Sequence, residues 1–322
     1  MTESDTFPTA RFIKEIGRGK NGARSLSQAD AAQLYAAMLA GRVADLELGA
    51  ILMAMRIKGE TAEEIAGFLM AAEASLTQLT APAVRYAPVV IPSYNGARNL
   101  PNLTPLLAAL LAREGVPVLV HGVLQDPTRV TTAEIMQELG LPPCQTILQA
   151  EVQLAQGKPA FLPIEILAPQ MAHLLSLRRI LGVRSSTHTL VKILQPFAGP
   201  ALRLNSYTHP EYLEMLGTYF MTLAPSARGD IFLMRGTEGE TVAHPKRAQQ
   251  IDWFHHGERS TLVEKQDPVD EMPPLPGARD AITTAQWITE ALAGQQPIPL
   301  PILQQVEQCR SVSERIQATI AL

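Results

Sequence analysis

The sequence predicts a small helical domain followed by a larger α/β domain, and three observations support this fold class. The 322-residue chain is 46% hydrophobic and 18% charged, the composition of a well-packed globular protein with one or two domains. Apolar residues recur at helical spacing over the first 75 or so residues. From about residue 81, short apolar strands alternate with helices, which indicates an α/β sheet. The predicted domains are therefore residues 1–75 and 81–322.

Capping residues mark the helices of the first domain. Ser27 is predicted to cap a helix over residues 28–40, and a second helix begins at Asp45. Thr61, followed three residues later by Glu64, is a capping box for a third helix. Each of these helices has one apolar face, so we expect them to pack together as a compact unit.

The second domain begins with the alternation of a βαβ unit. Short apolar runs at residues 89–91, 118–120 and 231–234 are predicted as buried strands. A helix is expected to start at Thr104, between the first two strands, and another is capped by Thr131 with the glutamate three residues later. This order of elements is typical of a sheet covered by helices.

Composition argues against several classes of protein. The two cysteines, Cys144 and Cys309, lie far apart without metal-type spacing, which fits a reduced, cytoplasmic protein. The N-terminal residues lack the basic and apolar regions of a signal peptide, and no apolar run is long enough to span a bilayer. We therefore expect no membrane partner, no metal and no cofactor. The net charge of −4 gives no indication of a nucleic-acid partner.

The distribution of charge is more informative than its sum. Residues 74–113 and 166–210 contain no acidic residue, although both segments contain arginines. Basic residues also crowd the N-terminal 11–24 region, whereas acids collect in residues 238–290. If folding brings the basic segments together, an acidic protein can still have a strongly positive surface. The alternative is that buried, apolar segments simply contain few acids.

Several segments resemble the anthranilate phosphoribosyltransferase family. They are FIKEIG at residues 12–17 followed by Leu26-Ser27, MAMRIKGETAEEIAG at 53–67, EGVPV at 114–118 with His121-Gly122, and residues 171–184, which end in LRRILGVR. The resemblance covers most of the chain and weakens after about residue 240. It implies that roughly residues 165–192 join the helical domain in space and that the larger domain has a central mixed sheet flanked by helices. It also implies a cleft between the domains and a homodimer formed through the helical domain.

The motifs that carry the family's chemistry are altered in this chain. A phosphoribosyltransferase holds pyrophosphate and magnesium with close-approach glycines and paired carboxylates. The family's Gly-Thr-Gly-Gly-Asp loop corresponds to PSYNGARN at residues 92–99, where only one glycine remains. Val123-Leu124 replaces the Asn-Arg of a second loop, and the metal-binding Asp-Glu pair corresponds to the TEGE of residues 237–240. No catalytic residue is therefore predicted, and we do not expect the chain to be an enzyme.

This pattern of loss resembles the YbiB family of transferase-like proteins. The resemblance implies a non-enzymatic protein that binds DNA or RNA without sequence preference, in the cleft that once held phosphoribosyl pyrophosphate. Aromatic residues are few, with Tyr94 as the best candidate for stacking on a base, so contacts to phosphates should predominate. The candidate phosphate-binding residues are Lys20, Arg24, Arg98, Arg129, Arg178, Arg184, Arg203, Arg235, Lys246 and Arg247.

Two other interpretations remain open at this point. The chain could be a phosphoribosyltransferase or nucleoside phosphorylase with an unknown base as substrate. Magnesium and pyrophosphate would then have to be held by four residues, Glu238, Glu240, Asn95 and Asn99. Alternatively, the chain could be a structural dimer that serves a protein partner. Tight magnesium-dependent binding of phosphoribosyl pyrophosphate would favour the enzyme, and a cleft without positive charge would favour the structural dimer.

Overall fold

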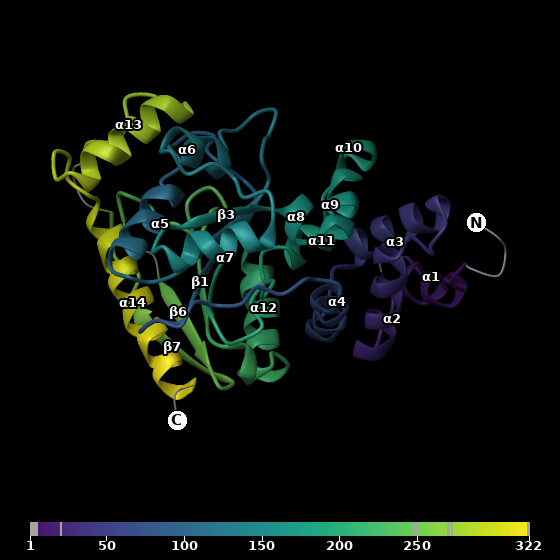
Figure 1. Cartoon of the computed structure of the whole chain (residues 1–322). Coiled ribbons are helices and arrows are strands. Elements are labelled where there is room, and N and C mark those ends of the chain that lie inside the picture. Colours follow the sequence, from purple (N-terminus) through teal and green to yellow (C-terminus); the bar gives the residue numbers. More distant parts are fainter. Residues whose placement is uncertain (1–5, 20, 248–249, 269–270, 272, 321–322) are drawn as a thin grey trace.

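The computed structural model describes residues 6–19, 21–247, 250–268, 271 and 273–320, and it consists of a helical lobe beside a larger lobe that contains a sheet (Figure 1). The strands are β1 (Val89–Ser93), β2 (Val118–Gly122), β3 (Ala160–Pro163), β4 (Leu202–Ser206), β5 (Ile231–Met234), β6 (Ile251–His255) and β7 (Glu258–Val263). The helices of the first lobe are α1 (Ala10–Ile16), α2 (Gln28–Leu39), α3 (Asp45–Lys58) and α4 (Ala62–Ala74). The later helices are α5 (Thr104–Arg113), α6 (Thr132–Glu138), α7 (Ile147–Ala155), α8 (Ile164–Leu167), α9 (Pro169–Ser176), α10 (Arg178–Leu181), α11 (Thr187–Leu190), α12 (Pro210–Thr222), α13 (Ala281–Leu292) and α14 (Leu300–Ile320).

The sheet of the larger lobe is mixed, as the family resemblance implied. Its strand order is β3-β2-β1-β4-β5-β6-β7, and the first five strands in this order are parallel. Strands β6 and β7 continue the sheet in antiparallel pairing. The carboxyl ends of β1 to β5 therefore meet at one edge of the sheet, where ligands bind in open α/β folds.

Alternate residues of each parallel strand point to two different cores. Val89 and Ile91 of β1 belong to a core that also contains residues of α5, α13 and α14, whereas Val90 belongs to the core that includes α7 and α12. Helices therefore cover both faces of the sheet, which explains why its central strands are continuous apolar runs. The second core continues without interruption into the helical lobe.

The helical lobe is completed by a segment from the middle of the chain. Helices α9 and α11 pack against α2 and α4, and Tyr35 Oη lies 3.0 Å from Thr187 Oγ1. Figure 1 shows α8 to α11 between the sheet and helices α1 to α3. The two lobes are thus joined by a well-packed helical layer, which lies beside the carboxyl edge of the sheet.

The elements expected from capping and periodicity are confirmed. Ser27, Thr61 and Thr131 each accept a hydrogen bond from the backbone amide three residues later, at the starts of α2, α4 and α6. The three predicted strands appear as β1, β2 and β5. Within the described residues, no helix combines the length and the apolar composition needed to cross a bilayer.

Candidate functional site

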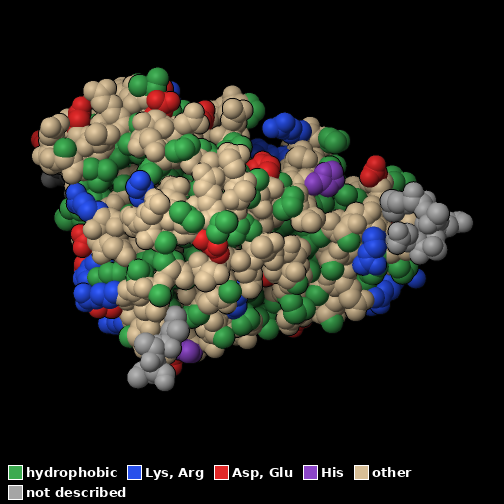
Figure 2. Space-filling view, viewed as in Figure 1, with side chains coloured by type: hydrophobic (Ala, Val, Ile, Leu, Met, Phe, Trp, Pro, Cys, Tyr) green, Lys and Arg blue, Asp and Glu red, His purple; other side chains and the backbone are tan. Residues whose placement is uncertain are grey.

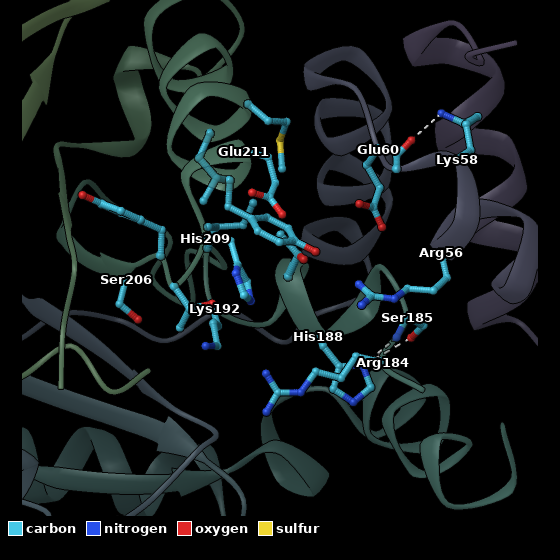
Figure 3. Close-up of a pocket in the computed structure, with 18 of the residues that line it drawn as sticks. Arg56, Lys58, Glu60, Arg184, Ser185, His188, Lys192, Ser206, His209 and Glu211 are labelled. Atoms are coloured by element: carbon cyan, nitrogen blue, oxygen red, sulfur yellow. Dashed lines mark hydrogen bonds between the residues drawn. The ribbon is translucent and has the colours of Figure 1, made fainter. Parts of the chain in front are cut away.

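The candidate site is a pocket of about 590 Å³ beside the carboxyl edge of the sheet. One wall comes from residues 56–60, at the end of α3 and in the turn that follows it, and a second comes from residues 184–193 around α11. The third wall comes from residues 206–216, at the end of β4 and the start of α12. Arg56 from the first wall and Arg184 and Lys192 from the second wall point toward the same space (Figure 3).

Five basic residues form what we call the cationic cluster, of which Arg56, Arg184 and Lys192 line the pocket and two lie near enough to act on Arg184. They are Arg56, Arg129, Arg178, Arg184 and Lys192. Burial lowers the pKa of the Arg184 guanidinium, and repulsion from the other three arginines lowers it further. Beyond the effect of burial, Arg184 and Arg129 likewise lower the pKa of Lys192, so Arg184 interacts with each of the other four members. Lys and Arg side chains also lie at a hollow in the upper edge of the molecule in Figure 2, where Figure 1 places α10.

Among the described residues, the cationic cluster has no direct ion pair, although Glu60 and Glu211 also line the pocket and the charge of Glu240 acts on Lys192. Among the described residues, no carboxylate lies within 4.0 Å of a charged nitrogen of any of its five members. Arg184 donates instead to the neutral Oδ1 of Asn95 at 2.9 Å, and Lys192 to the carbonyl of Gly239 at 3.3 Å. Beyond the effect of burial, repulsion from neighbouring cations lowers the pKa of both Arg184 and Lys192, so the nearby carboxylates offset the positive charge of the cluster only in part.

Burial also shifts the protonation of two other groups in the pocket. It lowers the pKa of Lys192 to about 8, an effect that Glu240 opposes and that Arg184 and Arg129 reinforce. It lowers the pKa of His188 to about 4, with further repulsion from Arg184. His188 is therefore neutral at pH 7, whereas Lys192 is mostly protonated and loses its proton above pH 8.

Next to the cationic cluster, backbone amides of the loop after β1 converge on a glutamate side chain of the same protein. Glu240 is 2% exposed, and its Oε1 accepts hydrogen bonds from the amides of Asn95 and Gly96, each at 2.7 Å. Gly96 has a φ of 70° and lies so close to Val130 that a Cβ would be 2.5 Å from the Val130 carbonyl oxygen. The donors that could cradle a phosphate thus hold a carboxylate instead.

A second carboxylate occupies the other end of the same loop. Glu238 accepts hydrogen bonds from the amide of Arg98 at 2.7 Å and from the amide and side chain of Asn99 at 2.9 and 2.7 Å. Burial alone would raise the pKa of Glu238, but these hydrogen bonds outweigh it and hold that pKa below its usual value. We call Glu238 and Glu240 together the carboxylate plug.

The carboxylate plug is presented by a tight turn. Glu238 and Gly239 have φ values of 54° and 91°, and they are the two central residues between Thr237 and Glu240, which form an isolated antiparallel bridge. Positive φ at both central positions is the pattern of a type I′ turn. The Gly239 carbonyl accepts from Asn95 Nδ2 at 2.7 Å, which fixes the turn against the loop. Three of the four carboxylate oxygens of the plug are engaged in this way.

These contacts decide how well the loop suits magnesium and pyrophosphate. A magnesium site needs free carboxylate oxygens, and the only unpartnered one in the plug is the buried Oε2 of Glu240. Lys192 already interacts with the charge of Glu240. In the part of the chain that the structure describes, no group of three or more His, Cys, Asp or Glu side chains is arranged to hold a metal ion. The residues present therefore do not fit a magnesium–pyrophosphate complex.

The structure brings three of the sequence-predicted basic residues together in the cationic cluster, namely Arg129, Arg178 and Arg184. Four others lie on loops at the same edge of the sheet. Arg98 is exposed on the loop after β1, but Glu238 binds its backbone amide. Arg235, whose charge acts on pocket residue Tyr207, follows β5. Lys246 and Arg247 lie farther along the loop between β5 and β6, beside His244.

Three predicted residues are not part of this group. The prediction that Arg203 lies at the cleft is wrong. Arg203 is 2% exposed in β4, a strand with helices on both faces. Arg24 lies after α1 in the helical lobe, where Glu15 is 3.7 Å away. Lys20 lies outside the described residues.

Two members of the cationic cluster, Arg56 and Lys192, were missed as candidate residues. The position of Lys192 in the acid-free 166–210 segment was the one feature of the sequence that could have identified it. Arg56 lies in the segment at residues 53–67, which the sequence analysis used only for its family resemblance. The expected stacking role of Tyr94 is also corrected, because its hydroxyl bonds to His121 Nδ1 at 2.8 Å and ties the ring inside the fold. Tyr207 and Tyr212 line the pocket in its place.

Comparison with known proteins places this architecture in a family. Residues 10–75 match the model of a glycosyl transferase family, helical bundle domain. The chain is 48% identical over 301 residues to an uncharacterized protein, YbiB, of Escherichia coli (strain K12), with 93% of this chain and 92% of that protein covered. The chain is a YbiB-like protein of the anthranilate phosphoribosyltransferase and glycosyltransferase family 3 superfamily.

More distant relatives of this YbiB-like protein are enzymes. It is 28% identical to an anthranilate phosphoribosyltransferase of Methylocella silvestris, over 70% of this chain and 62% of that enzyme. Its fold is similar to that of anthranilate phosphoribosyltransferase from Thermus thermophilus, with a TM-score of 0.68, 22% identity and 96% of each chain covered. The Saccharomyces cerevisiae enzyme in complex with PRPP and Mg gives a TM-score of 0.67 at 14% identity, over 97% of this chain and 94% of that one.

Proposed function

We propose that this YbiB-like protein is not an enzyme and that it binds DNA or RNA without sequence preference through the phosphate backbone. The observation that supports the proposal is a cluster of five cations, without a salt bridge among the described residues, beside a phosphate loop that is already filled by the carboxylate plug. Arginine and lysine side chains along a groove bind phosphates and release counterions, whatever the base sequence. The plug removes the amides that would hold pyrophosphate and leaves the positive charge of the pocket available.

The transferase alternative is disfavoured by the same contacts. It requires Glu238, Glu240, Asn95 and Asn99 to hold magnesium and pyrophosphate, but these four residues bond mainly to one another and to their own loop. The third interpretation, a dimer without a ligand, leaves the convergence of five cations that form no salt bridge among the described residues unexplained. Nucleic acid as partner accounts for both features of the site.

Sequence independence is tested by binding labelled oligonucleotides. Because phosphates are common to all strands, unrelated sequences should bind with affinities within about threefold of one another, as single strands and as duplexes. Fluorescence anisotropy at low salt measures these affinities directly. A preference of more than about tenfold for one sequence would show that base edges are read and would contradict binding through phosphates alone.

The affinity should also depend on pH through Lys192. A bound phosphate favours the protonated amine, so binding must weaken as the pH rises past the pKa of about 8. We expect a loss of about tenfold between pH 7 and pH 9, since a single proton is linked to binding. His188, whose pKa burial lowers to about 4, stays neutral over this range. The Lys192→Met variant should bind more weakly and lose the dependence, and an unchanged profile in this variant would exclude Lys192.

We further propose that the protein is a homodimer formed through its helical lobe. Leu46, Ala50, Met53 and Ile57 are spaced along one face of α3, and Leu46 and Ile57 are 87% and 65% exposed. An exposed apolar stripe of this kind, in a family for which a homodimer through this domain is expected, fits a self-complementary interface.

The dimer can be tested at the apolar stripe. In the double variant Leu46→Glu, Ala50→Glu, each subunit brings two negative charges to the twofold interface, and these repel those of its partner. Light scattering should therefore show a shift from dimer to monomer. Both side chains are exposed, and the fold should therefore survive. The matched control is Leu148→Glu on α7, which is 67% exposed and should leave the mass unchanged. A wild-type monomer, or a dimer that persists in the double variant, would reject this interface.

A further inference from the structure

Helix α10 carries an exposed isoleucine at the rim of the cationic cluster. Ile180 is 81% exposed, although it lies in a helical turn that hydrogen bonds fix at both ends. Leu177 and Leu181 pack, partly buried, against the core and anchor the turn. Figure 1 shows α10 at the outer end of the α8 to α11 layer. Ile180 is thus held outward on a short, anchored projection.

Ile180 and Ile57 are exposed apolar residues that lie next to arginines of the cationic cluster, and Ile180 is the more exposed of the two. Arg178 and Arg179 precede it in the same turn, and all three side chains are exposed. Arg178 belongs to the cationic cluster, and no acidic residue occurs between positions 165 and 211. A partner of this surface must therefore offer negative charge and an apolar face within a few ångströms of each other. A nucleic-acid strand has both, in its phosphates and in the faces of its bases.

We propose that Ile180 packs against the face of an unstacked base while the neighbouring arginines hold the phosphates on either side. This inference rests on the proposed nucleic-acid binding and adds to it a contact with the bases. Apolar side chains, isoleucine among them, serve as wedges between bases in other nucleic-acid-binding proteins. Because any base has an apolar face, such a contact adds affinity without adding sequence preference.

The test compares two polyanions, one with bases and one without. The Ile180→Ser variant of the full chain should bind a single-stranded oligonucleotide about tenfold more weakly, as expected when about half of the burial of an isoleucine is lost. Its affinity for inorganic polyphosphate should be unchanged, since no charge is removed. The matched control is Leu148→Ser, because Leu148 is 67% exposed on a helix without basic residues. This control should bind both ligands like the wild type.

A base analogue gives a second readout. An oligonucleotide with one 2-aminopurine brightens when that base is unstacked, so the wild-type protein should raise its fluorescence and Ile180→Ser should not. The inference is overturned if Ile180→Ser binds the oligonucleotide like the wild type, or if it loses oligonucleotide and polyphosphate equally. If the wild type binds polyphosphate and oligonucleotide with equal affinity per phosphate, the base contact fails while the proposed function stands. If it binds neither, both fail.

Discussion

Replacement of Arg129, Arg178 and Arg184 by glutamate in one variant is expected to weaken nucleic-acid binding by about 100-fold or more at low salt. Arg129 and Arg178 each interact with Arg184, which lines the pocket, and among the described residues none of the three has a carboxylate within 4.0 Å, so their charge is available to a phosphate. Loss of three phosphate contacts should also reduce the slope of log affinity against log salt by about three. Anisotropy titrations at several salt concentrations measure both quantities.

A matched variant separates the site from the total charge of the protein. Arg85, Arg113 and Lys158 are exposed and precede β1, β2 and β3, at the opposite edge of the sheet. Their replacement by glutamate changes the net charge by the same amount but should alter affinity by less than about threefold, because screening removes most of their influence at a distance. Equal losses in the two triple variants would mean that binding depends on overall charge and not on the cationic cluster.

Replacement of Glu240 by alanine is expected to destabilise the folded protein by about 3 kcal/mol. The change leaves the amides of Asn95 and Gly96 buried without an acceptor, and it breaks the link between the 237–240 turn and the loop after β1. Unfolding in urea, followed by circular dichroism, measures the difference in free energy. The Glu240→Gln variant keeps an acceptor oxygen at the same place and should lose only about 1 kcal/mol.

The same variants distinguish a carboxylate plug from a metal site. If Glu240 serves the loop alone, magnesium with phosphoribosyl pyrophosphate should not raise the melting temperature of the wild-type protein. A rise that requires both ligands, and that disappears in Glu240→Gln, would show that the carboxylate binds magnesium. That result would restore the transferase interpretation.

Much of the fold could be predicted because its signals are local. The caps at Ser27, Thr61 and Thr131 act within one helical turn, and the buried strands at 89–91 and 118–120 are short apolar runs between turn residues. Similarity to a known family supplied the mixed sheet and the division into two lobes. Neither signal depends on which distant residues come together.

The composition of the site could be predicted only in part, because it depends on long-range contacts. Arg203 looked like a surface arginine beside a strand, but helices cover both faces of that strand, and its flanking residues do not reveal this. Arg56 and Lys192 are 136 positions apart in the sequence, and only folding brings them to one pocket.

The role of the carboxylates at 238 and 240 could not be predicted from the sequence, for a different reason. Their spacing suggested a displaced metal pair, whereas the structure uses them as acceptors for the loop after β1. The glycine between them gave a partial signal, since it permits the tight turn that aims both carboxylates at the loop. No local pattern identifies the loop they meet, which lies about 140 residues earlier in the chain.

The salt dependence of oligonucleotide binding by the wild-type protein tests the central claim most directly. If the cationic cluster holds the phosphate backbone, log affinity should fall linearly with log salt, with a slope of about −4.5 for a duplex that contacts all five cations. A flat profile, or the absence of binding at low salt, would contradict the account and leave only the architecture of the protein established.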